Sequence, residues 1–214
     1  MLAAVRDPVL RATAIADLRP TQMTVGMREV QLKQQAWRDR KSSEFERYLT
    51  AHMAPVVLGP DDGRYLVDHH HLALALYNEG VESLFVYVVG DLRKCDDERR
   101  FWNLMEFKGW AHPFDAKGKR RSFDDLPKSI KHMKDDPYRS LAGELRDAGG
   151  YAKDLTPFSE FIWADFLRER IETKDIEDNF GAALARATEL AKSDDADYLP
   201  GYCAPHKTPR KRKR

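Results

Sequence analysis

Four polar residues in a row, Asp68-His69-His70-His71, form the part of this chain whose residue types could do chemistry. An apolar, strand-like run over residues 64–67 leads in, and an apolar run over 72–77 without β-branched residues leads out. A strand that turns at once into a helix presents polar side chains beside free backbone N–H groups. Phosphate binding, metal binding and proton transfer all use such a junction. The alternative is a solvated turn in which Asp68 merely caps the helix.

Adjacent histidines make a poor single metal site. In a strand, His69 and His71 would share a face that His70 does not. At the start of a helix, successive side chains fan out by about 100°. One ion therefore cannot take all three imidazoles, although a zinc site that adds Asp68 and His112 stays open.

The elements around this motif predict a small α+β unit. Residues 14–19 and 84–89 read as strands, and residues 20–26 as a loop. A turn rich in Gly and Asp joins 55–58 to 64–67 as a hairpin. The stretch 27–53 has helical composition, with a break at Ser42-Ser43. The motif therefore lies where a hairpin strand meets a helix that ends near Gly80.

The second half of the chain is predicted to be helical. We expect helices over 96–107, with Phe101, Leu104 and Met105 as the apolar face, from Asp124 onward, and over 137–150, 157–171 and 175–192. The predicted domains are an α+β domain over residues 1–92, a helical domain over 93–200, and a disordered basic tail over 201–214.

Three segments resemble the ParB/sulfiredoxin superfamily, and within it the branch of ParB-like nucleases. They are Leu-Arg-Pro-Thr-Gln-Met-Thr-Val-Gly at 18–26, Asp-Pro-Tyr-Arg-Ser-Leu at 136–141, and Phe-Ser-Glu-Phe-Ile-Trp-Ala-Asp-Phe at 158–166. The Asp-His-His-His junction is also similar to that family's motif. The resemblance spans residues 15–172 and implies a mixed-sheet ParB/sulfiredoxin-like domain followed by helices.

The resemblance also implies roles for single residues. The helix N-terminus would hold the phosphates of a nucleotide, ATP or ADP, with Mg²⁺ as a further cofactor held by Asp68. Catalysis would rest on Asp68, on His70 as acid or base, and on Glu29, which stands where kinase-like relatives use a carboxylate. The implied nucleotide-binding residues are Thr21, Gln22, Gly26, Arg28, His69 and His71.

Two positions depart from the family pattern. Residue 69 is His where many relatives have Gly, which lets backbone approach a phosphate closely. The Arg that often ends the motif, and that would give two-pronged phosphate contacts, is absent, since His71 and Leu72 stand there. A protonated His71 would supply a pH-dependent contact instead.

The functional prediction is therefore a protein that binds nucleotide or nucleic-acid phosphate at the 68–71 junction. The reaction would be phosphodiester hydrolysis by a nuclease or phosphoryl transfer by an ATP-dependent enzyme. Two alternatives stay open. One is a non-catalytic DNA-binding module that uses the basic tail, and the other is a scaffold of enzyme origin that has lost its chemistry.

Charge is unevenly distributed along the chain. The formal net charge is +1, but residues 207–214 hold six of the 36 Lys and Arg, and the remaining 30 face 35 acidic residues, about −5. Such a basic block could grip nucleic-acid phosphates without sequence preference. The two cysteines match no zinc or redox spacing. No signal sequence or membrane span is evident, so we expect a cytoplasmic protein with nucleotide or nucleic-acid partners; oligomeric state is not predicted.

Overall fold

The computed structural model describes residues 11–204 and divides the chain into two compact units, which meet between Asp136 and Pro137. The division therefore lies well beyond the boundary expected at residue 92. Residues 93–136 belong to the first unit because their helix packs on the sheet and their strand β7 (Lys134–Asp135) pairs with β3 (Thr24–Val25). Of the predicted tail, residues 205–214 lie outside the described residues, whereas 201–204 are described.

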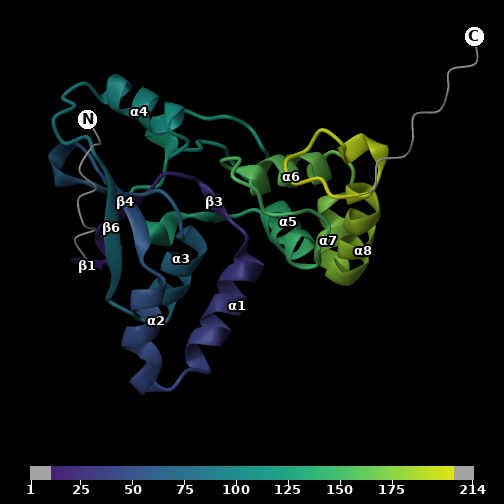
Figure 1. The fold of residues 1–214 in the computed structure, drawn as a ribbon, viewed down its shortest axis with the longest axis horizontal. Helices are drawn as coiled ribbons and strands as arrows, with labels where there is room; N and C mark the ends of the chain where they lie inside the picture. The colour runs from purple at the N-terminus through teal and green to yellow at the C-terminus, as the bar shows by residue number, and fades with distance from the viewer. Residues whose placement is uncertain (1–10, 205–214) are drawn as a thin grey trace, which may run out of the picture. The chain divides into compact units, whose positions relative to one another are not determined.

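The first unit is built on a mixed five-stranded sheet (Figure 1). Its strands, in spatial order, are β1 (Arg11–Ala14), β6 (Ser83–Asp91), β4 (Ala54–Leu58), β5 (Arg64–Leu66) and β2 (Leu18–Pro20). Neighbouring pairs alternate between antiparallel and parallel along that order. The antiparallel β4–β5 pair is the hairpin that the turn residues predict, and the α+β class is confirmed.

The strand expected over residues 14–19 is instead two strands, β1 and β2, at opposite edges of the sheet. A 3₁₀ turn, Ile15–Asp17, separates them. In a flat sheet five strands wide the edges would be ~19 Å apart. The four peptide steps from Ala14 to Leu18 reach at most ~14 Å. The sheet must therefore curl until its edges approach one another.

The first three helices of the first unit are α1 (Met27–Arg38), α2 (Phe45–Ala51) and α3 (His70–Asn78). The helical stretch over 27–53 does break near the serine pair, and the Trp37 and Phe45 rings stack across the break, 4.2 Å between centroids. Helix α3 is buried from His70 to Leu76 and packs along α1 (Figure 1). A helix buried on all sides needs no polar stripe, which explains its unbroken apolar sequence.

Helix α4 (Glu98–Phe107) adds a second, separate hydrophobic cluster to the first unit. Phe101, Trp102 and Met105 are its buried residues, whereas Leu104, expected on the apolar face, is exposed. The helix expected from Asp124 does not form. Only 3₁₀ turns occur there, because a residue before proline avoids the helical region and Leu126, which precedes Pro127, is extended.

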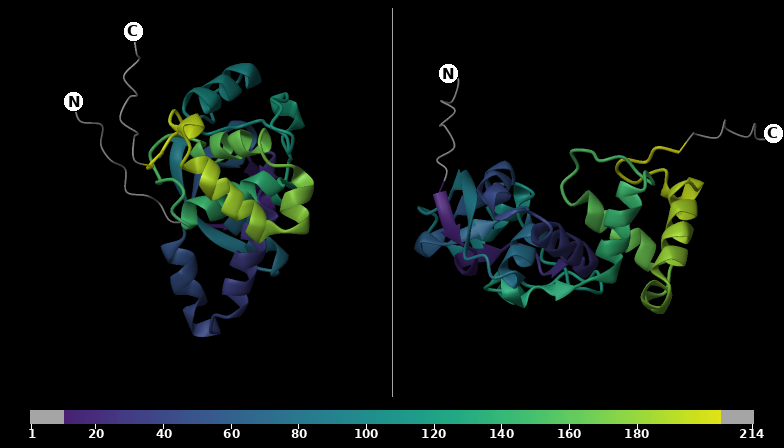
Figure 2. Two further views of the ribbon diagram at one scale, coloured as in Figure 1. Left: turned by 90° about the vertical axis from the view of Figure 1, so that its right-hand side faces the viewer. Right: turned by 90° about the horizontal axis from the view of Figure 1, so that it is seen from below.

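The second unit is entirely helical in its described part (Figure 2). It comprises α5 (Pro137–Asp147), α6 (Ser159–Arg168), α7 (Thr173–Asp178) and α8 (Phe180–Ala191). The helix expected over 175–192 is split at Asn179, whose side-chain oxygen caps α8 by accepting the Ala182 N–H. Across residues 11–204, no helix combines the length and apolarity that crossing a bilayer requires.

Candidate functional site

The Asp68–His71 motif lies where expected, between the end of β5 and the start of α3. His69 is the N-cap residue and has left-handed backbone angles, φ 64° and ψ 25°. Its N–H donates to the Asp68 carboxylate over 2.7 Å, and its own side chain makes no capping hydrogen bond to α3. Glycine adopts this conformation without strain. The local geometry thus matches a motif with glycine here, although the residue is His.

The loop over residues 21–26, the polar loop, is buried beside this junction. Thr21, Gln22 and Thr24 are 1%, 6% and 1% exposed. The Thr21 hydroxyl donates to the Leu66 carbonyl over 2.8 Å, which joins the loop to the end of β5. Loop carbonyls also accept backbone N–H groups from residues 112, 134 and 136. The loop is therefore a fixed part of the unit and not a solvated connection.

His70 and His71 hold this loop against α3. The Thr21 N–H donates to His70 Nε2 at 3.2 Å, and the Gly26 N–H donates to His71 Nε2 at 2.9 Å. A nitrogen that accepts a hydrogen bond carries no proton, so each neutral ring bears its proton on Nδ1. Both side chains are buried, 3% and 9% exposed. The two imidazoles therefore position the loop.

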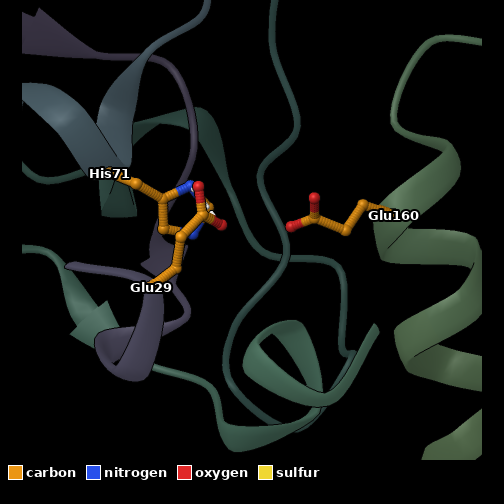
Figure 3. Close-up of side chains that lie close together, drawn as sticks. All are labelled: Glu29, His71 and Glu160. Carbon is orange, nitrogen blue, oxygen red and sulfur yellow. Dashed lines mark ion pairs between the residues drawn. The ribbon is translucent and has the colours of Figure 1, made fainter. Parts of the chain in front are cut away.

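Glu29 lies in the first turn of α1, beside His71. Its Oε2 is 3.4 Å from His71 Nδ1, and its Oε1 is 3.2 Å from the Lys33 ammonium one turn further along α1. Figure 3 shows the His71 ring against the Glu29 carboxylate. A carboxylate on Nδ1–H fixes the tautomer in which Nε2 accepts from Gly26. Glu29 thus supports the attachment of the loop.

His69 differs from its two neighbours. Its Nδ1 is buried and forms no hydrogen bond with any described residue. Burial lowers the pKa of His69, and the nearby charges of His52 and Lys33 lower that pKa as well. Asp68 and the His52 carbonyl act in the opposite direction. The start of α3 thus combines an N-cap residue that makes no side-chain cap, a buried imidazole nitrogen that bonds to no described residue, and two further basic side chains.

The predicted site residues therefore fall into two groups. Thr21, Gly26 and Glu29 come together with His70 and His71 around the polar loop. Asp68 and His69 form the turn before α3, while Gln22 stays inside the loop, where its amide donates to the Thr24 carbonyl. Arg28 is an exposed residue of the first turn of α1.

Sequence reasoning missed two basic residues near the motif. Lys33 follows Glu29 by four positions, a spacing that pairs side chains on a helix and could have been read from the sequence. His52 comes from the end of α2, and nothing in the sequence connects it with His69.

For the predicted metal site, the described residues do not bring Asp68 together with two other His, Cys, Asp or Glu ligand atoms. The imidazoles of His70 and His71 also accept from two different backbone N–H groups, those of Thr21 and Gly26. A zinc site has little support from this donor set. Magnesium often keeps most of its waters and takes one or two carboxylates, so a single Asp68 contact remains compatible with its chemistry.

In the second unit, two of the resembling segments meet through one ion pair. Arg139 on α5 donates twice to Glu160 on α6, from Nε at 3.0 Å and from Nη2 at 2.9 Å. Arg146 adds a third contact to the same carboxylate at 2.9 Å. The Arg139 side chain is only 5% exposed, so this pair joins the two helices inside the unit. Figure 3 also draws Glu160 on α6.

Comparisons with known proteins agree with this architecture. A family model described as "Putative ParB-like nuclease" matches residues 11–169. The crystal structure of protein Atu1540 from Agrobacterium tumefaciens is 49% identical, with a TM-score of 0.88, and the match covers 94% of this chain and 100% of that one. A search of curated proteins found no match. With a family model spanning well over half of its length and the motif at the strand-to-helix junction, this chain belongs to the ParB-like family.

Proposed function

We propose that the first unit binds a phosphate group of a nucleotide or nucleic acid at the start of α3. The observation that carries this proposal is the helix end itself, where the side chain of the N-cap residue His69 makes no capping hydrogen bond. The first N–H groups of a helix point out of its end and, with the helix dipole, favour an anion. Beside that end, the Nδ1 atom of His69 is buried without a hydrogen-bond partner among the described residues.

The charges around the helix end support an anionic ligand. Lys33 and His52 lie near enough to His69 to affect its pKa. Asp68 is the opposing charge, exposed and bonded to the His69 N–H. A phosphate would therefore gain from the helix dipole, from His52 and from Lys33, although Lys33 is already paired with Glu29. The Asp68 carboxylate would oppose the phosphate, and Mg²⁺ could neutralise that charge.

The geometry supports binding better than it supports chemistry by the predicted groups. The Nε2 atoms of His70 and His71 already accept backbone N–H groups, so neither is placed to take a proton there. Glu29 contacts His71 and Lys33. For hydrolysis or phosphoryl transfer, Asp68 with Mg²⁺ is the group of the motif that we consider best placed, because it is exposed.

Calorimetric titration of ATP, ADP and CTP, with and without Mg²⁺, tests the proposal. His69→Glu places a negative charge at the helix end and should weaken binding about tenfold or more. His132→Glu makes the same change at an exposed histidine in another turn and should leave the affinity unchanged. Thermal unfolding of each variant verifies that it is folded.

Asp68→Asn separates the two roles of that carboxylate. Without Mg²⁺ the substitution should tighten binding several-fold, since it removes a repelling charge. If Asp68 holds Mg²⁺, the same substitution should weaken binding when the metal is present. Absence of binding by all three nucleotides, or unchanged affinity in a folded His69→Glu variant, would refute the proposed site.

A further inference from the structure

The first unit contains a cavity of about 560 Å³ that the α3 motif does not use. Strands β2 and β5, helix α4 and the turns at 123–128 line this half-open cavity. The residues that matter to its chemistry are Arg19, Tyr65, Glu98, Trp102, Phe123 and Lys128. Tyr65 belongs to the α4 cluster, whereas the next residue, Leu66, packs in the core with α3. Successive strand residues point to opposite faces, so this cavity and the α3 motif lie on opposite faces of the sheet.

Aromatic rings form one wall of the cavity. The Trp102 ring is stacked on Phe123, 5.0 Å between centroids with 4° between planes, and meets Tyr65 edge-on at 5.5 Å. The Tyr65 ring packs directly against two glycines of the hairpin turn, Gly59 and Gly63. Any larger residue there would clash with the ring, because its Cβ would lie less than 3 Å from a ring carbon. The wall is therefore held by its own packing.

Two cations stand at this wall. Arg19 Nη1 donates to the Tyr65 hydroxyl over 3.1 Å, and its guanidinium lies 5.5 Å from the ring centroid. Within residues 11–204, neither Arg19 nor Lys128 is found in an ion pair. Glu98 and Asp124 also line the cavity, and the Ser122 hydroxyl donates to the Asp124 carboxylate at 3.4 Å. The cavity thus combines aromatic rings, two cations and two carboxylates, one of which, Asp124, also accepts from a serine hydroxyl.

We propose that this cavity binds a single nucleotide unit, with the base against the aromatic wall and the phosphate at Arg19 and Lys128. Aromatic rings stack with any base, and a guanidinium forms strong hydrogen bonds with phosphate. Glu98 is placed to accept from a sugar hydroxyl or an exocyclic amine. The volume lies within the range of small-molecule sites, about 300–1,000 Å³. The unit is either a free nucleotide or one residue of a single strand, and the site is independent of the proposed phosphate site at α3.

The Trp102 indole N–H resonance reports on this cavity in solution. Titration with AMP, CMP, GMP or UMP should shift it saturably. The Trp163 indole N–H, which donates to the Pro200 carbonyl in the second unit, should not move. The double variant Arg19→Gln/Lys128→Gln should weaken binding about tenfold. Lys131→Gln, an exposed lysine three residues beyond Lys128, is the matched control and should bind like the unmodified protein.

Titration with a single-stranded DNA pentanucleotide shows whether the cavity binds free nucleotides or one residue of a nucleic-acid strand. Binding about tenfold tighter than that of any mononucleotide assigns the cavity to a strand, and equal or weaker binding assigns it to free nucleotides. His69→Glu should leave these Trp102 shifts intact, so the two proposed sites can fail separately. The cavity proposal is overturned if neither kind of ligand moves Trp102, or if the folded double variant binds with unchanged affinity.

Discussion

At the scale of single residues, three adjacent histidines play two different roles. His70 and His71 each accept a backbone N–H from the polar loop, whereas His69 occupies a left-handed position with an unpartnered nitrogen. The difference follows from the backbone, because His70 and His71 lie in the first turn of α3 whereas His69 precedes it with left-handed angles. The name of a residue type in a motif is therefore not enough to assign its role.

The left-handed backbone of His69 predicts an inverted order of stability between two substitutions. Both His69→Gly and His69→Ala remove the imidazole, but alanine retains the Cβ that the positive φ disfavours. The glycine variant should be more stable than the alanine variant by about 1 kcal/mol, the reverse of their order inside a helix. Urea unfolding measures the difference, and an alanine variant of equal or greater stability would contradict the assigned conformation.

Burial of His69 predicts a loss of stability in acid. Its pKa in the folded protein lies below the ordinary value of 6.5, so the unfolded chain binds the proton more readily. This residue's stabilisation is complete above that value and falls as the pH decreases through it toward the folded pKa. Glutamine does not titrate, so the His69→Gln variant lacks this loss. Its free energy of unfolding, relative to that of the unmodified protein, should therefore increase as the pH is lowered from about 7.5 to about 5. A constant difference in urea unfolding free energy would exclude this linkage.

At the scale of elements, the polar loop is fixed to α3 because two histidine side chains of the helix accept hydrogen bonds from backbone N–H groups of the loop. A buried N–H without an acceptor costs free energy, so these bonds are needed once the loop is buried. Strand β7 pairs with β3 inside this loop, and the N–H of Asp136 donates to the Val25 carbonyl. The C-terminal end of the first unit is thereby attached to the polar loop.

Loss of one of these acceptors should destabilise the first unit. His71→Leu leaves the Gly26 N–H buried without its acceptor and should lower the free energy of unfolding by about 2 kcal/mol. His132→Leu changes an exposed histidine and should alter that free energy by less than about 0.5 kcal/mol. Equal effects of the two substitutions in chemical denaturation would argue against a structural role for His71.

At the scale of the whole molecule, the described chain consists of two units with separate hydrophobic cores. The core around α3 and the cluster around α4 belong to residues before 137, and the cluster around Trp163 belongs to the helices after it. The family model reaches into both units, ending at residue 169.

The position of the division predicts which fragment folds. A fragment of residues 1–136 retains the sheet, the α4 cluster and the β3–β7 pair, and should unfold in one cooperative thermal transition. A fragment of residues 1–92 loses α4 and β7, which leaves the sheet face at Tyr65 uncovered, and should not show such a transition. Cooperative unfolding of the 1–92 fragment would show that the first domain ends near residue 92, as the sequence predicts, and would contradict a domain that extends to residue 136.

The sequence alone determined those features that depend on neighbouring residues. Hairpin residues 59–63, the apolar run of α3 and its end before Gly80 follow from local turn, burial and capping preferences, and the structure has them. Three short segments in order were enough to identify the family. Local signals also misled, as in the helix expected at Asp124, where Pro127 prevents helical backbone.

Only the tertiary structure decided what the candidate site residues contact. His70 meets Thr21 and His71 meets Gly26 across 49 and 45 positions of chain, and no local pattern encodes such pairs. The cavity at Trp102 likewise unites β2, β5 and α4, which the sequence assigned to two different domains. The reason is physical: a hydrogen bond or an aromatic contact acts over a few ångströms in space, and the fold sets which distant residues come that close.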